Sequence, residues 1–264
     1  MRDENQNFKI SVVTICLNNK DGLKKTINSV IFQDYDNLEL IIVDGGSTDG
    51  SKELLEEFND SISYWVSEKD NGIYSAQNKG ILYSTGDYIL FLNSGDYLVD
   101  SQVVSDVVDE ISGESVVYGD LLIDYGDHQE KGISPNQITP RFMIKSTLWH
   151  PVSFIKSDLF RKYGLYDESF KIVGDYDFFL KVLIQGRESY KHLSRQVACF
   201  NTMGIGSSEK WFSLHEEERL ISQKKYFSER NILDLKSDPP QGWRYFVSFL
   251  MNGVYLLYRK VVKK

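Results

Sequence analysis

Short apolar stretches alternate with amphipathic stretches over the first hundred residues. The apolar stretches are rich in Val and Ile, which is typical of buried strands, and they lie at residues 8–18, 38–43, 62–67 and 88–93. Between them, apolar residues recur at helical spacing: one helix is expected from a cap at Asp21 to about Gln33, a second after the turn 47–50, and a third at 73–84. This order predicts a parallel sheet with right-handed crossovers.

The pattern is less regular in the second half of the chain. Helices are expected at about 101–112, 157–163 and within 174–186, and strands at 115–124 and within 189–201, while the polar stretch 126–140, with two prolines, indicates a loop. A charged helix is expected at 209–232, before Pro239-Pro240 and a last amphipathic helix. We therefore divide the chain into a domain at 1–208 and a helical extension at 209–264.

Composition excludes several classes of protein. With 264 residues, 41% hydrophobic and 26% charged, the chain has the make-up of a globular protein with a sizeable core. The net charge of −8 argues against nucleic acid as the main partner. The two cysteines, Cys16 and Cys199, and an N-terminus without an apolar signal stretch suit a cytoplasmic location.

Two aspartates follow expected strands. Asp44 ends LELIIVD and precedes a glycine-rich turn, and Asp96 ends YILFLNSGD. In an open α/β sheet, ligands bind beyond the carboxyl ends of the strands. Two acids there suit a nucleotide, one accepting from N–H groups and one holding a divalent cation on phosphates. The alternative is that both are ordinary turn residues, with Asp44 capping a helix.

Three segments together resemble family 2 glycosyltransferases of the GT-A fold. They are ISVVTICLNNKDGLKKTINSVIFQDYDNLELIIVDGGSTDGS (10–51), DNGIYSAQNKGILYSTGDYILFLNSGD (70–96) and VGDYDFFLKV (173–182). The turn NSGD is most similar to bacterial surface-polysaccharide and O-antigen sugar transferases. The resemblance implies an α/β fold with a mixed, mainly parallel sheet flanked by helices.

The resemblance also implies a reaction. The enzyme would transfer a sugar, with inversion, from a nucleotide-diphosphate donor to a hydroxyl of a glycan or lipid-linked acceptor in polysaccharide biosynthesis. A UDP-sugar is the expected donor and Mn²⁺ or Mg²⁺ the expected cofactor. Two rivals remain: a non-catalytic nucleotide-sugar-binding protein, and a sugar-phosphate nucleotidylyltransferase, for which the loop after the first strand lacks the required Gly/Arg-rich sequence.

On the donor side, the resemblance assigns Asp44 to the base, beside the backbone of Thr14 and Cys16, and Asp96 to the cation. The turn 93–96 departs from the family's DxD pattern at Asn93 and at Gly95. Asn93 is nevertheless expected to contact the nucleotide. Gln77 stands where the family often has arginine, and Lys79 or Lys69 is the candidate to replace that charge.

On the acceptor side, the resemblance makes Asp175 the base that takes the proton from the acceptor hydroxyl, although Gly174 replaces the usual preceding glutamate. The alternative is that Asp175 only begins a helix. Asp177 is expected to face about 200° away on a helix and to have another role. His150 is a candidate for contacting metal, phosphate or acceptor, or is a packed residue.

Two further segments leave alternatives open. Residues 204–208 form either a loop over the donor or a plain turn. Residues 241–264 carry five basic residues and no acid beside an apolar face. This pattern fits peripheral contact with the inner face of the cell membrane, and equally docking on the body or on a second subunit.

Overall fold

The structure, a computed structural model, describes residues 7–202 and 209–237. In these ranges the strands form one sheet in the order β3-β2-β1-β4-β8-β6-β9-β5, with β7 paired to β6. The predicted tail at 241–264 and the predicted loop at 204–208 lie outside the described residues.

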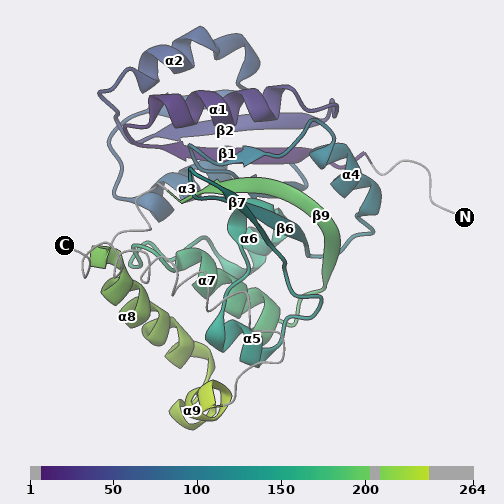
Figure 1. Cartoon of the computed structure of the whole chain (residues 1–264), viewed down its shortest axis with the longest axis vertical. Coiled ribbons are helices and arrows are strands. Elements are labelled where there is room, and N and C mark those ends of the chain that lie inside the picture. The colour runs from purple at the N-terminus through teal and green to yellow at the C-terminus, as the bar shows by residue number, and fades with distance from the viewer. Residues whose placement is uncertain (1–6, 203–208, 238–264) are drawn as a thin grey trace, which may run out of the picture.

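The first half is a parallel α/β unit, as the pattern predicts. Strands β1 and β2 are flanked by β3 and β4, and all four run parallel. Figure 1 shows α1 and α2 on one face of this part of the sheet and α3 on the other. The elements are β1 (Ile10–Cys16), α1 (Lys20–Ile31), β2 (Leu38–Asp44), α2 (Ser51–Glu57), η1 (Asn59–Ser61), β3 (Tyr64–Ser67), α3 (Ile73–Tyr83) and β4 (Tyr88–Phe91).

The second half makes the sheet mixed. Strand β8 lies between β4 and β6 and is antiparallel to both, whereas β6 and β9 are parallel. The elements are β5 (Tyr97–Leu98), α4 (Val103–Glu110), β6 (Val116–Asp124), β7 (Gln129–Gly132), α5 (Pro140–Lys145), η2 (His150–Val152), β8 (Ser153–Lys156), α6 (Asp158–Tyr163), α7 (Gly174–Phe179), η3 (Leu180–Gln185) and β9 (Tyr190–Asn201).

Several local expectations were wrong. Asn19, not Asp21, caps α1, because its side chain accepts from the Gly22 N–H at 3.2 Å. Part of the expected loop 126–140 is β7, whose polar residues pair along the edge of β6. By contrast, the helix expected within 174–186 is confirmed as α7, which continues as the π-helix η3.

Alternation along the strands places the core on both faces of the sheet. Val12 packs in the cluster that contains side chains of α1, α2 and α4, and Val13 packs in the cluster that contains side chains of α3, α6 and α7. Successive side chains of a strand point to opposite faces, so continuous apolar strands such as β1 and β2 are buried on both.

The C-terminal helices α8 (Glu209–Tyr226) and α9 (Glu229–Ser237) replace the single helix expected at 209–232. Buried polar side chains join α8 to the body: Arg219 donates to the Met143 carbonyl at 2.9 Å, and Ser222 donates to Asp177 at 2.8 Å. The described part of the extension is therefore packed on the body, and the division at 208/209 stays a prediction.

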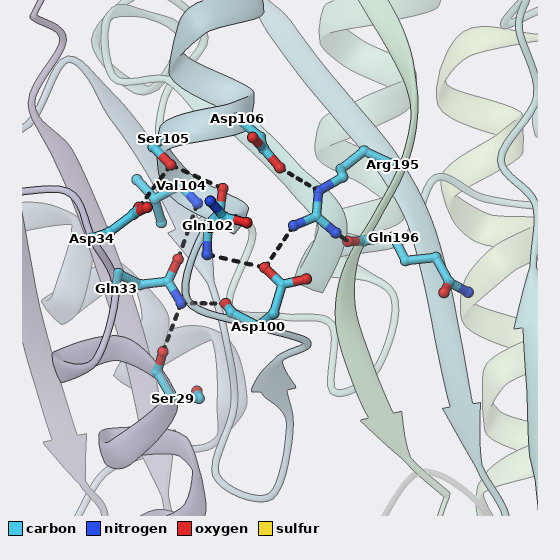
Figure 2. Close-up of polar contacts among 10 residues, drawn as sticks. All are labelled: Ser29, Gln33, Asp34, Asp100, Gln102, Val104, Ser105, Asp106, Arg195 and Gln196. Carbon is cyan, nitrogen blue, oxygen red and sulfur yellow. Dashed lines mark hydrogen bonds and ion pairs between the residues drawn. The ribbon is translucent and has the colours of Figure 1, made fainter.

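A polar network links α1, the segment before α4, and β9 (Figure 2). Gln33 donates to the Asp100 carbonyl at 2.7 Å and accepts from the Val104 N–H at 3.0 Å. Arg195 on β9 donates to Asp100 at 2.6 Å and to Asp106 at 2.8 Å. These bonds hold the segment directly after β5, the strand that follows Asp96 and pairs with β9.

Candidate active site

The turn after β2 is organised by Asp44. Its side chain is fully buried, and its carboxylate accepts from the Ser47 N–H at 2.9 Å, from the Ser67 hydroxyl at 2.6 Å and from the Ser47 hydroxyl. The structure thus shows Asp44 in the turn-holding arrangement, and its predicted role toward the base is not tested by these contacts.

Asn18 and Asn19, between β1 and α1, connect the two acidic turns. The Asn18 N–H donates to Ser47 Oγ at 2.7 Å, and its side chain accepts from the Thr48 N–H at 2.8 Å. Asn18 has a φ of 50°, a left-handed conformation that asparagine tolerates better than most residues. The Asn19 amide donates to the Ser94 carbonyl at 2.9 Å. Our sequence reasoning missed this pair, although two asparagines at a strand end are a usable signal.

Helix α1 also holds the NSGD turn in place. Thr26, which is fully buried, donates to the Asp96 carbonyl at 2.6 Å and accepts from the Gly95 N–H at 3.0 Å. Gly95 has a φ of 105°, where a side chain would be strained. Thr26 had no motif around it, so only the fold reveals this contact.

Asp96 is a buried carboxylate with little compensation. It is 4% exposed, and its side chain accepts from the Asn201 N–H at 3.1 Å. Burial raises its pKa to about 7, although the charge of His150 and the bond from Asn201 act in the opposite direction. A carboxyl group in this state gains strongly from a nearby cation.

His150 lies between the two predicted halves of the site. Its Nδ1 is 3.2 Å from an Asp175 oxygen, and its Nε2 is 3.2 Å from the Asn93 amide nitrogen. The other Asp175 oxygen accepts from the Tyr74 hydroxyl at 2.9 Å. The sequence-predicted residues Asn93, His150 and Asp175 are therefore in one hydrogen-bonded chain, 57 and 25 positions apart along the sequence.

Asp175 and His150 shift each other's pKa. Burial alone would raise the pKa of Asp175, but the bond and charge of His150, with the Tyr74 hydroxyl, hold that pKa below its ordinary value. Burial would lower the pKa of His150, yet Asp175 and the charge of Asp96 raise it. The pKa shifts thus favour an ionised carboxylate at Asp175, and in the chain His150 donates from Nδ1 to Asp175 and accepts at Nε2 from the Asn93 amide.

Asp177 faces away from this chain, as its helical spacing predicts. Its carboxylate accepts from Ser222 at 2.8 Å and from Tyr226 at 3.2 Å, and it pairs with Lys225 at 3.2 Å. All three partners are on α8. Asp175 and Asp177 thus have separate surroundings on opposite sides of α7.

The remaining predicted residues lie around the donor side. Thr14 and Cys16 are buried in β1, and burial raises the pKa of the Cys16 thiol. Lys79 pairs with Glu68 at the end of β3, so its charge is already engaged. Gln77 is 2% exposed; its amide donates to Asn93 at 3.4 Å, and its Oε1 has no partner among the described residues.

The residues fit a cation held mainly by its substrate. Among the described residues, no three His, Cys, Asp or Glu side chains are grouped so that they could hold a metal ion. Mg²⁺ is commonly bound through one or two carboxylates together with substrate phosphates and water. Asp96 is one buried carboxylate that accepts from the Asn201 N–H. It fits a cation bound mostly by substrate phosphates and water better than a cation bound by protein side chains alone.

Comparison with known proteins decides the family. Residues 11–171 match the family described as glycosyl transferase family 2. The chain belongs to this family. An uncharacterized glycosyltransferase of Mycobacterium tuberculosis is 35% identical over 206 residues, covering 75% of this chain and 77% of its relative. The PGL/p-HBAD biosynthesis glycosyltransferase of Mycobacterium bovis is 26% identical over 200 residues, covering 74% and 77%.

Solved structures confirm the fold of this family 2 glycosyltransferase. The chain resembles Staphylococcus aureus TarS 1-349, solved in complex with UDP, with a TM-score of 0.62 and 17% identity over 87% of this chain and 75% of TarS. It also resembles a Pyrobaculum calidifontis mannosyltransferase in complex with GDP-Man and Mn²⁺, with a TM-score of 0.65 and 13% identity over 87% and 69%. The predicted GT-A class, a mixed sheet flanked by helices, is confirmed.

Proposed function

We propose that this glycosyltransferase transfers a sugar from a nucleotide-diphosphate donor, a UDP-sugar, to an acceptor hydroxyl with inversion at the anomeric carbon. The observation that supports this most is the chain Asp175–His150–Asn93, which joins an ionised carboxylate to the turn that carries Asp96. A base and a diphosphate-binding turn next to each other are what a displacement at the anomeric carbon requires.

Asp175 acts as the general base. The acceptor oxygen forms a bond to the anomeric carbon while the bond from that carbon to the diphosphate oxygen breaks, and the hydroxyl proton passes to Asp175. The lowered pKa of Asp175 keeps its carboxylate free to accept this proton. Attack from the face opposite the leaving group inverts the configuration.

On the donor side, Asp96 would hold the divalent cation, Mn²⁺ or Mg²⁺, which when bound neutralises the charge of the leaving diphosphate. Asn93 and Lys79 contact the nucleotide, and the backbone of Thr14 and Cys16 lies with Asp44 near the base. His150 holds Asp175 toward the acceptor, with its other nitrogen at Asn93, on the phosphate side.

The acceptor is a glycan or a lipid-linked glycan. The name of the M. bovis relative places that protein in the biosynthesis of PGL and p-HBAD, which supports an acceptor in glycan assembly. No helix in the ranges 7–202 and 209–237 is long and apolar enough to cross a membrane. We propose that the basic segment 241–264 makes a peripheral contact with the membrane face where such an acceptor is presented.

The first test is a donor screen. Purified full-length protein is incubated with UDP-, GDP- and dTDP-sugars and Mn²⁺ or Mg²⁺, with acceptor lipid extract, and release of nucleoside diphosphate is measured. We expect turnover with a UDP-sugar. Binding of the donor without release in any mixture would favour the non-catalytic binder.

The same assay tests the cation. EDTA and the substitution Asp96→Ala should each abolish release, because loss of a charged contact at the leaving diphosphate removes several kcal/mol of transition-state stabilisation. Circular dichroism should show Asp96→Ala to be folded. Full activity in EDTA would exclude a metal-dependent mechanism.

A further inference from the structure

Tyr74 has one hydroxyl proton and two acceptors within reach. Its oxygen lies 2.5 Å from the Ile172 carbonyl oxygen and 2.9 Å from Oδ1 of Asp175. A phenol hydroxyl donates one hydrogen bond and can accept others, so it donates to only one of these oxygens at a time. Tyr74 lies in the first turn of α3, whereas Ile172 and Asp175 lie directly before and within the first turn of α7. The hydroxyl therefore joins two helices next to the proposed base.

Both acceptors of the Tyr74 hydroxyl are held by other residues. The Ile172 N–H donates to Glu218 of α8 at 3.0 Å, which fixes the chain at Ile172. Oδ2 of Asp175 lies 3.2 Å from Nδ1 of His150. Oδ1 is therefore the oxygen of Asp175 that can take a proton while the bond from His150 is kept.

The ring of Tyr74 occupies the space beside Gly174. A Cβ placed on Gly174 would lie 2.9 Å from three carbon atoms of this ring. Tyr74 is 4% exposed and its ring centroid is 5.5 Å from that of Tyr166, so the packed ring has little freedom to move aside. Gly174 does not have a positive φ, so its backbone conformation does not require glycine. The glycine at the position where the resemblance expects glutamate thus admits the Tyr74 ring next to Asp175.

The surroundings keep the Tyr74 hydroxyl protonated. Burial and the charge of Asp175 raise the pKa of Tyr74 well above its ordinary value. Burial also acts to raise the pKa of Asp175, but the bonds from His150 and Tyr74 hold that pKa below its ordinary value. The charge of Asp175 further acts to raise the pKa of Tyr166, beside Tyr74, and that of Arg219 on α8. Tyr74 therefore supplies no net proton to the reaction and acts only through its hydrogen bonds.

We propose that Tyr74 is a positioning residue for the base, its hydroxyl donating to Oδ1 of the ionised Asp175 and turning to the Ile172 carbonyl when Oδ1 takes the acceptor's proton. The proposal rests on the proposed function, because it assumes that Asp175 is the base. In the step, the acceptor O–H bond breaks, its oxygen bonds to the anomeric carbon, and the bond from that carbon to the diphosphate breaks. The proton moves to Oδ1, and the new carboxyl O–H donates to the Tyr74 oxygen, 2.9 Å away. Tyr74 thus keeps a hydrogen bond to Asp175 before and after the proton transfer.

The first test is Tyr74→Phe in the full-length protein, which removes the hydroxyl and keeps the ring against Gly174. With the UDP-sugar and lipid extract of the donor screen, kcat should fall about 10- to 100-fold, the range for losing a hydrogen bond to a charged group. The KM for the donor should stay the same, because the hydroxyl does not contact the donor. The acid limb of the kcat/KM profile should move to higher pH, because loss of the hydroxyl raises the pKa of Asp175.

The matched control is Tyr166→Phe. Tyr166 is a buried neighbour of the Tyr74 ring, and its hydroxyl has no hydrogen-bond partner among residues 7–202 and 209–237. Its loss should leave kcat and the acid limb unchanged. An equal loss of kcat in the two variants would show a general packing effect and overturn the role of the Tyr74 hydroxyl.

The plateau of kcat at high pH tests whether the hydroxyl turns. If Tyr74 only lowered the pKa of Asp175, the Tyr74→Phe variant would regain the wild-type kcat at pH values above the shifted acid limb. If the hydroxyl also accepts from the protonated carboxyl group, the plateau should stay about 10-fold below that of wild type. Recovery of the wild-type plateau would overturn the proposal.

Titration of Asp175 gives a readout that does not need turnover. Carboxyl ¹³C NMR of aspartate-labelled full-length protein follows this titration, and Asp175→Asn assigns the resonance. Tyr74→Phe should move the midpoint to higher pH, and Tyr166→Phe should not. An unchanged midpoint in Tyr74→Phe would overturn the proposal. A shifted midpoint without release of nucleoside diphosphate by wild type would instead refute the proposed function.

Gly174→Ala tests the place of the ring. The added Cβ should displace the Tyr74 ring and lower kcat, although the hydroxyl is still present. In the double variant with Tyr74→Phe, the losses should be less than additive, because the hydroxyl is already absent. Melting temperatures above the assay temperature show that the variants are folded. Fully additive losses would show that Gly174 acts independently of the Tyr74 hydroxyl and would contradict its proposed part in placing it.

Discussion

The imidazole of His150 touches both Asp175 and Asn93, so one side chain sets the geometry between the acceptor base and the donor turn. Two other predicted residues have partners away from His150: Asp44 joins its own turn to Ser67 of β3, and Lys79 on α3 pairs with Glu68. At the scale of single residues, the proposed function therefore depends on a buried contact between Asp175 and His150, where removing the imidazole leaves the carboxylate with fewer partners.

The substitution Asp175→Asn preserves size and most hydrogen bonding but cannot accept a proton. We expect turnover to fall by roughly 10²- to 10⁴-fold with donor binding little changed. Steady-state kinetics and calorimetry check this. Asp177→Asn is the matched control on the same helix; a large loss of turnover there, with a mild effect at Asp175, would show that the base is misassigned.

The substitution His150→Asn should alter the pH dependence. Without the imidazole of His150, less opposes the effect of burial on the pKa of Asp175, so that pKa rises and the carboxylate becomes protonated at higher pH. Activity requires the ionised base, and the acid limb of the kcat/KM profile should therefore move to higher pH, with lower kcat at neutral pH. His128→Ala, at an exposed histidine, is the control. If the acid limb of the kcat/KM profile is unchanged, His150 does not set the pKa of Asp175.

At the scale of elements, α7 joins the site to the C-terminal helices. One side of α7 presents Asp175 to His150, and the other presents Asp177 to α8. Glu218 on α8 accepts from the N–H groups of Lys171 and Ile172 at 2.8 and 3.0 Å, just before α7. Docking of α8 thus holds the segment directly before α7, the helix that carries Asp175.

Arg219 tests this docking. It is 8% exposed, donates to the carbonyls of Met143 and Ser146, and lies over the Tyr176 ring at 4.0 Å. Arg219→Met should lower the free energy of unfolding by about 2–3 kcal/mol, because the Ser146 carbonyl loses the Arg219 donor, the Met143 carbonyl keeps the Tyr176 hydroxyl but loses Arg219, and the cation–π contact is lost. Urea denaturation measures this. Arg230→Met, on the exposed face of α9, should change stability by less than about 0.5 kcal/mol.

At the scale of the whole molecule, charge is unevenly distributed. The chain carries a net charge of −8, yet residues 241–264 contain five basic residues and no acidic one. An acidic body is repelled by an anionic bilayer, so membrane contact would have to be made by this segment. The segment lies beyond the described residues, and its role is a matter for experiment.

Full-length protein should co-sediment with anionic phospholipid vesicles at low salt, because each Lys or Arg near the surface contributes about 1 kcal/mol. Truncation after Pro240 should abolish this binding and much of the activity on a lipid-linked acceptor, and leave nucleotide binding intact. Truncation that lowers the melting temperature or dissociates a dimer, seen by light scattering, would indicate docking on protein. Absence of vesicle binding by the full-length chain would exclude the membrane contact.

The first four parallel strands and their helices could be predicted from the sequence, because apolar periodicity and glycine-rich turns are local. Asp96, in the turn after β4, and Asp175, at the start of α7, were singled out from local patterns in the same way, and their roles stay predictions. The sequence did not reveal that β8 inserts between β4 and β6, since a four-residue apolar strand has the same pattern as a buried loop or helix turn.

Only the tertiary structure decided the contacts between segments that are far apart in the sequence. The pairing of His150 with Asp175, the bonds from Asp177 to α8, and the place of Tyr74 between Ile172 and Asp175 depend on which elements pack together. Periodicity tells which face of an element is buried but not which side chain it meets there. The polar contacts of this site are made across elements, and packing, not local sequence, selects them.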